Sequence, residues 1–290
     1  MEAEILYPSE CQLGESPAWH PERESCFWVD IEGRSLHEYK WLEKNLTTYQ
    51  LDFRVSLVIP GKNNEVILGL QGGIAKYNLD SRTLSWVTDL GINWEHIRCN
   101  DGTCDSKGRL WIGTMAMDFA SGAGSVFCID KSKKIQKRIS KVSISNGMAW
   151  SNDNKRLYYI DSLTRRVSSF FYKEESGEIV FEKVAIHIPE AMGLPDGMAI
   201  DEEGMLWVAL WGGFGVGRFN IKTGKRVAFI KVPAPHVSSC SFAGKDLDHL
   251  VITTAKEGMT PEDIVKYPES GNVFIVKPGV KGVPAFNCEI

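Results

Sequence analysis

The chain has 290 residues, of which 43% are apolar and 24% are charged, ordinary values for a globular protein with a sizeable core. Its 33 basic and 37 acidic residues give a net charge of −4, which argues against a surface for nucleic acid or anionic membranes. No apolar run approaches the roughly 18 residues that span a bilayer, and no leader pattern precedes the first strand. We therefore expect a cytoplasmic protein with no nucleic-acid or membrane partner.

Seven cysteines are scattered along the chain without a Cys-x-x-Cys pair. An odd count without paired spacing favours reduced, packed thiols over a disulfide framework or a zinc-thiolate site. This usage agrees with a reducing compartment.

Short segments rich in β-branched and aromatic residues follow one another along almost the whole chain, bounded by turn-forming residues. Clear examples, in chain order, are residues 2–7, 26–30, 65–69, 109–113 and 272–276. Only residues 260–267 favour a helix, of one or two turns. The pattern predicts an all-β protein.

A unit made of a polar residue, a short strand, a turn and a second strand recurs along the sequence. Residues 100–114 and 196–210 show it most clearly, because each contains an Asp-x-x-Gly turn and a Trp eleven positions after the start. The six copies start at residues 15, 56, 100, 146, 196 and 239. A second pair of strands follows the first in most copies, and four-stranded units of this length indicate a β-propeller.

The last unit supplies only three clear strands, whereas the strand at residues 2–7 precedes the first unit. Pairing that strand with the last blade would close the ring and protect its sheet edges. The prediction is a six-bladed β-propeller with four antiparallel strands per blade, formed as a single domain by residues 1–290.

Equivalent positions of successive blades form a ring around the axis of a propeller. The first positions of the six units are Glu15, Ser56, Asn100, Asn146, Asp196 and Ser239. Two carboxylates and two carboxamides would thus meet near a narrow channel, where unpaired carboxylates are costly. A bound cation would relieve that cost, and oxygen ligands favour Ca²⁺, Mg²⁺ or Mn²⁺. The alternative is a wet channel in which these side chains hydrogen-bond to loops and to each other.

Five blocks of sequence resemble the senescence-marker-protein/gluconolactonase family, which includes regucalcin and luciferin-regenerating enzyme. The blocks are LGESPAW (13–19), RCNDGTCDSKGRLWIGTM (98–115), SNGMAWSNDNKRLYYIDS (145–162), PDGMAIDEEGMLWVALWGG (195–213) and VSSCSFAGKDLDHLVITTA (237–255). They span nearly the whole chain in the family's order. The first block has Ser16 where the family usually has Gly.

The resemblance implies one divalent metal ion (Ca, Mg, Mn or Zn) and a small-molecule sugar lactone as substrate. The implied metal ligands are Glu15, Asn146 and Asp196. Arg98 and Asn100 match family residues that bind the substrate, and Asn100 would also lie beside the metal. Asp118 stands where vertebrate members carry a substrate-binding Glu, and its shorter side chain leaves the sugar preference open.

The implied reaction is hydrolysis of a sugar-acid (aldono) lactone to the free acid. In our hypothesis the metal polarises the lactone carbonyl, and Asp196 takes a proton from the attacking water as general base. Two other functions remain open, namely a related aryl-esterase or phosphotriesterase, and a calcium-binding regulatory propeller without strong catalysis. We expect a monomer or a weak oligomer.

Three further features near the last two units bear on the site. The glycine-rich stretch 212–217 is followed by a strand and by no helix, so it predicts a loop after the second strand of its blade rather than a dinucleotide site. Trp211, beside it, could either shape the substrate cavity or pack in the core. His236, just before the sixth unit, is a candidate for the pocket rim.

Overall fold

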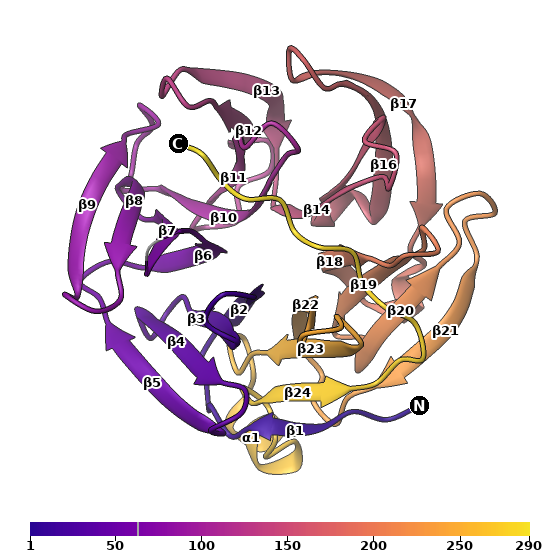
Figure 1. Cartoon of the computed structure of the whole chain (residues 1–290). Coiled ribbons are helices and arrows are strands. Elements are labelled where there is room, and N and C mark those ends of the chain that lie inside the picture. Colours follow the sequence, from indigo (N-terminus) through magenta and orange to yellow (C-terminus); the bar gives the residue numbers. More distant parts are fainter. Residues whose placement is uncertain (63) are drawn as a thin grey trace.

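A computed structural model describes residues 1–62 and 64–290 of the chain. The strands of these residues form six four-stranded sheets, arranged around a common axis as the blades of a propeller (Figure 1). The pairs of neighbouring strands within the sheets are antiparallel. The predicted all-β, six-bladed propeller is therefore confirmed.

In each of the first three blades, consecutive strands run from the axis outward. The first blade is β2 (Gly14–His20), β3 (Ser25–Asp30), β4 (Ser35–Lys40) and β5 (Asn45–Gln50). The second is β6 (Val55–Pro60), β7 (Glu65–Leu70), β8 (Gly73–Asn78) and β9 (Thr83–Thr88). The third is β10 (Ile97–Cys104), β11 (Leu110–Ala116), β12 (Gly124–Ile129) and β13 (Ile135–Val142).

The next two blades follow the same plan. The fourth blade is β14 (Ser145–Trp150), β15 (Arg156–Asp161), β16 (Arg166–Lys173) and β17 (Glu178–His187). The fifth is β18 (Leu194–Ile200), β19 (Leu206–Trp211), β20 (Gly215–Phe219) and β21 (Arg226–Lys231). Short 3₁₀ turns at Ser162–Thr164 and Glu190–Met192 lie in the connecting loops of this region. The glycine-rich stretch 212–217 includes the loop between β19 and β20, as expected.

The sixth blade joins the two ends of the chain. It consists of β22 (Val237–Ala243), β23 (His249–Thr254), β24 (Val273–Val276) and, outermost, β1 (Glu4–Tyr7). Glu4 pairs with Ile275, and Ile5 pairs with Phe274. The N-terminal strand therefore completes the last blade, as the missing fourth strand predicted.

One short helix, α1 (Pro261–Lys266), lies between β23 and β24 within the predicted helical segment. Thr260 caps it by accepting a hydrogen bond from the Asp263 backbone N–H, and Pro261 occupies its first position. None of the helices in the described part of the chain is long and apolar enough to cross a membrane.

Three tryptophans fill the core between blades, and Trp111 and Trp207 occupy matched positions of their repeat units. Trp28, Trp111 and Trp207 are at most 1% exposed. The Trp111 and Trp207 indole N–H groups donate to Asp105 and Asp201 at 2.8 and 2.9 Å. These aspartates belong to the repeated Asp-x-x-Gly turns, so each turn also holds the core tryptophan of its blade.

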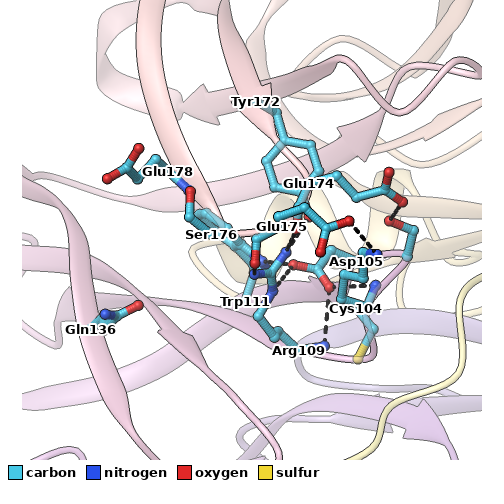
Figure 2. Close-up of polar contacts among 12 residues, drawn as sticks. Cys104, Asp105, Arg109, Trp111, Gln136, Tyr172, Glu174, Glu175, Ser176 and Glu178 are labelled. Atoms are coloured by element: carbon cyan, nitrogen blue, oxygen red, sulfur yellow. Dashed lines mark hydrogen bonds and ion pairs between the residues drawn. The ribbon is translucent and has the colours of Figure 1, made fainter.

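A polar clasp ties the third blade to the fourth (Figure 2). Arg109 donates from Nε to Asp105 Oδ2 at 2.6 Å and from Nη2 to the Tyr172 hydroxyl at 2.6 Å. Its other bonds reach backbone carbonyls of the hairpin between β16 and β17, including Glu175 O at 3.2 Å. The buried guanidinium thus joins two blades on the side of the ring where the first strand of a blade turns into its second.

Every innermost strand is interrupted near the repeated polar position. Pairing with the second strand shifts register between Glu15 and Ala18, Val55 and Leu57, Cys99 and Gly102, Ser145 and Met148, Pro195 and Met198, and Val237 and Ser239. A bulge of this kind bends the strand and redirects a side chain out of the regular alternation. Six bulges at one level give the ring its inward-facing polar side chains.

Ring closure by β1 generates a stability prediction. A chain lacking residues 1–5 keeps Tyr7 and its aromatic contacts with Trp28 and Tyr39, but loses half of β1 and its pairing with Phe274 and Ile275 of β24. Because an open edge strand has unpaired backbone groups and can pair with another chain, we expect the melting temperature to fall by about 5 °C and light scattering on heating to increase. Calorimetry and scattering that match the full chain would contradict this role for β1.

Candidate functional site

The predicted ring is present at the axis, with one member on each innermost strand. Its members are Glu15, Ser56, Asn100, Asn146, Asp196 and Ser239, and they are between 4 and 8% exposed. The innermost strands of neighbouring blades contact one another around the whole ring. The structure therefore gathers the ring residues at one level, as the repeat predicted.

The two carboxamides are connected to each other and to their surroundings. Asn100 donates from Nδ2 to Asn146 Oδ1 at 3.1 Å and to Ser145 O at 2.6 Å. Asn146 in turn donates from Nδ2 to Ser162 Oγ at 2.8 Å. These bonds fix the Asn146 side chain with its amide oxygen on the Asn100 side, available to a further partner.

Arg98 lies on the same strand as Asn100, two residues before it. Its Nη1 donates to Asn100 Oδ1 and to Cys99 O, the latter at 3.0 Å. Burial lowers the pKa of the guanidinium, and Glu257, Glu32 and Glu15 oppose that effect. Asn100 therefore joins Arg98 to Asn146, so both atoms of its side-chain amide are used by protein groups.

Three carboxylates share the buried centre of the ring. Burial and the nearby charge of Asp101 raise the pKa of Glu15 to about 8. Burial, Glu15 and Asp101 together raise the pKa of Asp196 well above its ordinary value. Burial raises the pKa of Asp101 itself to about 6. Each of these groups is thus destabilised as an anion by its surroundings.

Asp101 is a site residue that the sequence analysis did not identify. It follows Asn100 in the bulge, at the position occupied by Gly147 and Gly197 in the next two blades. An acidic residue where the next two units have glycine is the signal that could have identified it. Glu257, which precedes α1, was missed because no repeat position marks it.

A divalent cation fits this set of groups. Asp196 Oδ1 is buried without a hydrogen-bond partner. The side-chain atoms at the ring that could bind a metal are oxygens, which hard cations prefer. No group of three or more His, Cys, Asp or Glu side chains within residues 1–62 and 64–290 is arranged to hold a metal. A metal at the ring therefore needs the amide oxygen of Asn146 beside the carboxylates of Glu15 and Asp196.

A second tier of side chains lies one step along the innermost strands from the ring. Because side chains alternate along a strand, the residues two positions before the ring face the same way. They are Leu13, Arg54, Arg98, Ile144, Leu194 and Val237, and His236 adjoins Val237 just before β22. Blades two and three thus contribute arginines, whereas blades four and five contribute aliphatic side chains.

The charges of the second tier are balanced. Arg54 donates from Nε to both carboxylate oxygens of Glu32, at 2.9 and 3.0 Å. Among the acidic groups that support the charge on Arg98, Glu257 acts most strongly. The two arginines are therefore balanced in charge by nearby acidic groups, and Arg54 already donates to Glu32 and Gln71.

His236 stacks on Trp211, with ring centroids 4.2 Å apart and an interplanar angle of 10°. Trp211 is partly buried and also packs against the apolar core of the first two blades, while a role in shaping the substrate cavity stays a prediction. Burial lowers the pKa of His236, and its Nδ1 has no hydrogen-bond partner in the described part of the chain. A neutral imidazole therefore stacks on Trp211 just before β22, and its place at the pocket rim stays a prediction.

Two other sequence expectations concern loops. Asp118 lies in an exposed turn after β11, where its Oδ1 accepts a hydrogen bond from the Ala120 backbone N–H at 3.1 Å. Its role toward a substrate stays a prediction.

Ser16 has a φ of 51°, a conformation that favours glycine. The Ser16 hydroxyl accepts a hydrogen bond from the Val58 N–H at 3.0 Å and donates one to Val58 O. These two bonds tie the first blade to the second.

Comparison with known proteins gives the family. The family model described as "SMP-30/Gluconolactonase/LRE-like region" matches residues 13–256. The chain belongs to this family, as its sequence blocks predicted.

Several relatives match over nearly the whole chain. Rabbit (Oryctolagus cuniculus) regucalcin is 33% identical over 98% of this chain and 97% of its own length. The Bacillus subtilis protein named "Putative sugar lactone lactonase YvrE" is 34% identical over 94% of both chains. Among solved structures, calcium-binding regucalcin from Agrobacterium tumefaciens superposes with a TM-score of 0.95, at 26% identity over 100% of this chain and 98% of that one.

The buried carboxylates predict an unusual pH dependence of stability in the presence of a chelator. A carboxyl group whose pKa is raised on folding stabilises the fold fully below its unfolded value, and that contribution is lost as pH rises through the folded value. For Glu15 this interval runs from about 4.5 to about 8. We therefore expect the melting temperature of the chelated protein to fall as pH rises over this interval.

The matched variant is Glu15→Gln, which removes the titrating group but keeps the side-chain length. It should show a shallower fall, because Asp196 and Asp101 still titrate in the ring. Equal slopes in thermal melts of the two proteins from pH 5 to 8 would show that Glu15 does not carry the repulsion.

Proposed function

We propose that this protein is a divalent-metal-dependent lactonase that hydrolyses sugar-acid lactones to the free acids. The observation that carries the proposal is the buried ring in which three carboxylates meet at the axis of a propeller of this family. The name of the Bacillus subtilis relative supports the reaction class. The calcium-binding relative supports a divalent ion, with Ca²⁺, Mg²⁺, Mn²⁺ and Zn²⁺ as the candidates.

Glu15, Asn146 and Asp196 would hold the metal ion. When bound, the ion would supply a Lewis-acid centre that polarises the lactone carbonyl and offsets the negative charge that develops on its oxygen. Asn100 would position this set, since it bonds to Asn146 Oδ1 on one side and receives a bond from Arg98 on the other.

Asp196 is the residue proposed to move the proton. Its Oδ1 has no partner among the described residues, so it can accept a proton from a water molecule placed beside the lactone. The same carboxyl can then return the proton to the ring oxygen as the ester bond breaks. No covalent intermediate with the protein is needed, because water attacks the acyl carbon directly.

The second tier indicates the class of substrate. Arg98 uses Nη1 for protein carbonyls, which leaves Nη2 and Nε as donors for a ligand. Because Glu257 and Glu32 balance the arginines, the second tier suits neutral hydroxyl groups better than an anionic substituent. Arg98, Asn100 and Asp118 remain the proposed substrate-binding set, with Asn100 acting through its neighbours.

The first experiment is a hydrolysis assay on chelated protein with a pH indicator. Ca²⁺, Mg²⁺, Mn²⁺ and Zn²⁺ are added back singly, with pentono- and hexono-lactones and one aryl ester as substrates. Lactone turnover restored by metal supports the proposal. Metal binding without turnover of any substrate would instead support the calcium-binding regulatory alternative, and turnover of the aryl ester alone would support the esterase alternative.

Substitutions at the ring should separate the proposed roles. Asp196→Asn keeps the shape but removes the base, and we expect kcat to fall about 10²- to 10⁴-fold. The control is Glu178→Gln, which breaks an exposed ion pair with Lys173 in the outer hairpin of the fourth blade and should leave kcat unchanged. An Asp196→Asn enzyme with full kcat and bound metal would rule out Asp196 as the base.

Arg98→Gln tests substrate binding by the second tier. Loss of the guanidinium should raise KM for a polyhydroxylated lactone about tenfold or more, and should affect an unsubstituted lactone much less. Steady-state kinetics on the two substrates measure the difference. An equal effect on both would mean that Arg98 acts on the ring residues rather than on substrate hydroxyls.

Cytoplasmic location and a monomeric or weakly oligomeric state stay predictions.

A further inference from the structure

The C-terminal segment, residues 277–290, crosses the face of the propeller opposite the ring. Gly282 pairs with Asp201 in the turn between β18 and β19, and its N–H donates to Leu247 O at 2.8 Å. Further along, the Glu289 N–H donates to Gly108 O at 2.8 Å in the turn between β10 and β11. Figure 1 shows this segment in yellow, running from the sixth blade across the propeller axis to the third blade. We call it the C-terminal strap.

The end of the strap is anchored in the apolar core of the third blade. Ile290 is 7% exposed and belongs to the cluster that contains Cys104, Leu110 and Ile112. Phe286 and Cys288 pack against the same cluster. The last residues of the chain are thus held by side-chain packing as well as by the Glu289 hydrogen bond.

This packing brings two thiols together. Cys288, on the strap, packs against the apolar cluster that contains Cys104 at the end of β10, and the two thiols influence each other's ionisation. They are 184 positions apart in the sequence. In Figure 2 the Cys104 sulfur points away from the Asp105 carboxylate and so lies outside the polar clasp.

The two thiols differ in access to solvent. Cys104 is 3% exposed, whereas Cys288 is only partly buried. Of the other five cysteines, which are all buried, Cys128 on β12 is the one that lies near Cys104. A reagent from solvent therefore reaches Cys288 first and meets Cys104 only through it.

We propose that Cys104 and Cys288 form a reversible disulfide that locks the C-terminal strap onto the third blade. A suitable oxidant is a low-molecular-weight disulfide such as oxidised glutathione. The Cys288 thiolate attacks one sulfur of the oxidant, forming a mixed disulfide and releasing one thiol. Cys104 then loses its proton and attacks Cys288 Sγ, which forms the protein disulfide and releases the second thiol. Two protein thiols are oxidised and one small disulfide is reduced to two thiols.

The order of these steps has a kinetic consequence. Burial raises the pKa of the Cys104 thiol, so its thiolate is scarce and the second step is the slow one. The mixed disulfide at Cys288 should therefore form first, and the locked protein should follow at a rate that increases with pH.

The test uses the full-length protein incubated with oxidised glutathione and then denatured for thiol titration. We expect free thiols to fall from seven to about five, the intact mass to fall by about 2 Da, and one cross-linked peptide to join Cys104 to Cys288. The melting temperature should rise by about 5 °C, because the cross-link restricts the unfolded chain, and dithiothreitol should reverse the shift.

Two variants make the test specific. Cys288→Ser should keep its remaining six thiols after oxidation and show no shift in melting temperature, whereas Cys128→Ser should still form the cross-link. Three results would overturn the proposal, namely an unchanged thiol count in the wild-type protein, a persistent glutathione adduct at Cys288, or a cross-link from Cys104 to Cys128. Because the readouts need neither metal nor substrate, they are independent of the proposed lactonase activity.

Discussion

Burial of like charges at the axis is the constraint on which the rest of the structure depends. Glu15, Asp101 and Asp196 are drawn together by three different blades, and each would be more stable apart from the others. The core tryptophans, the polar clasp and the closing strand stabilise the propeller, whereas the repulsion among these carboxylates destabilises it. A ligand that removes the repulsion would therefore stabilise the whole propeller, so binding and folding are linked through the same carboxylates.

The bulges explain how a regular sheet presents such a centre. In an unbroken strand, side chains alternate between the two faces of the blade, and both faces pack against neighbouring blades. A register shift in each innermost strand turns one polar side chain toward the axis instead. The hydrogen bonds among Arg98, Asn100 and Asn146 then hold these side chains in fixed relative positions.

The sequence predicts this architecture well because each blade repeats the same local signals. Six copies of one pattern fixed the number of blades, and the surplus strand before Glu15 indicated how the ring closes. The same repeat identified the ring residues, whereas Arg98 was indicated only by the resemblance to the family. Asp101 and Glu257 were missed because they depart from the repeat, and their closeness to Arg98 and Glu15 depends on the bulge and on a long loop. Contacts between distant segments, such as Cys104 with Cys288, leave no local signal at all.

Closure of the ring by β1 also constrains how the chain is made. The strand at Glu4–Tyr7 is synthesised before every other strand of the propeller, yet its partner β24 begins at Val273. At roughly 5–20 residues per second, the first strand waits on the order of tens of seconds for its place in the sheet. During that interval the first five blades can form in order, while β1, which precedes the first blade, has no partner strand. The newly synthesised protein is thus most exposed to mispairing just before its last strand appears.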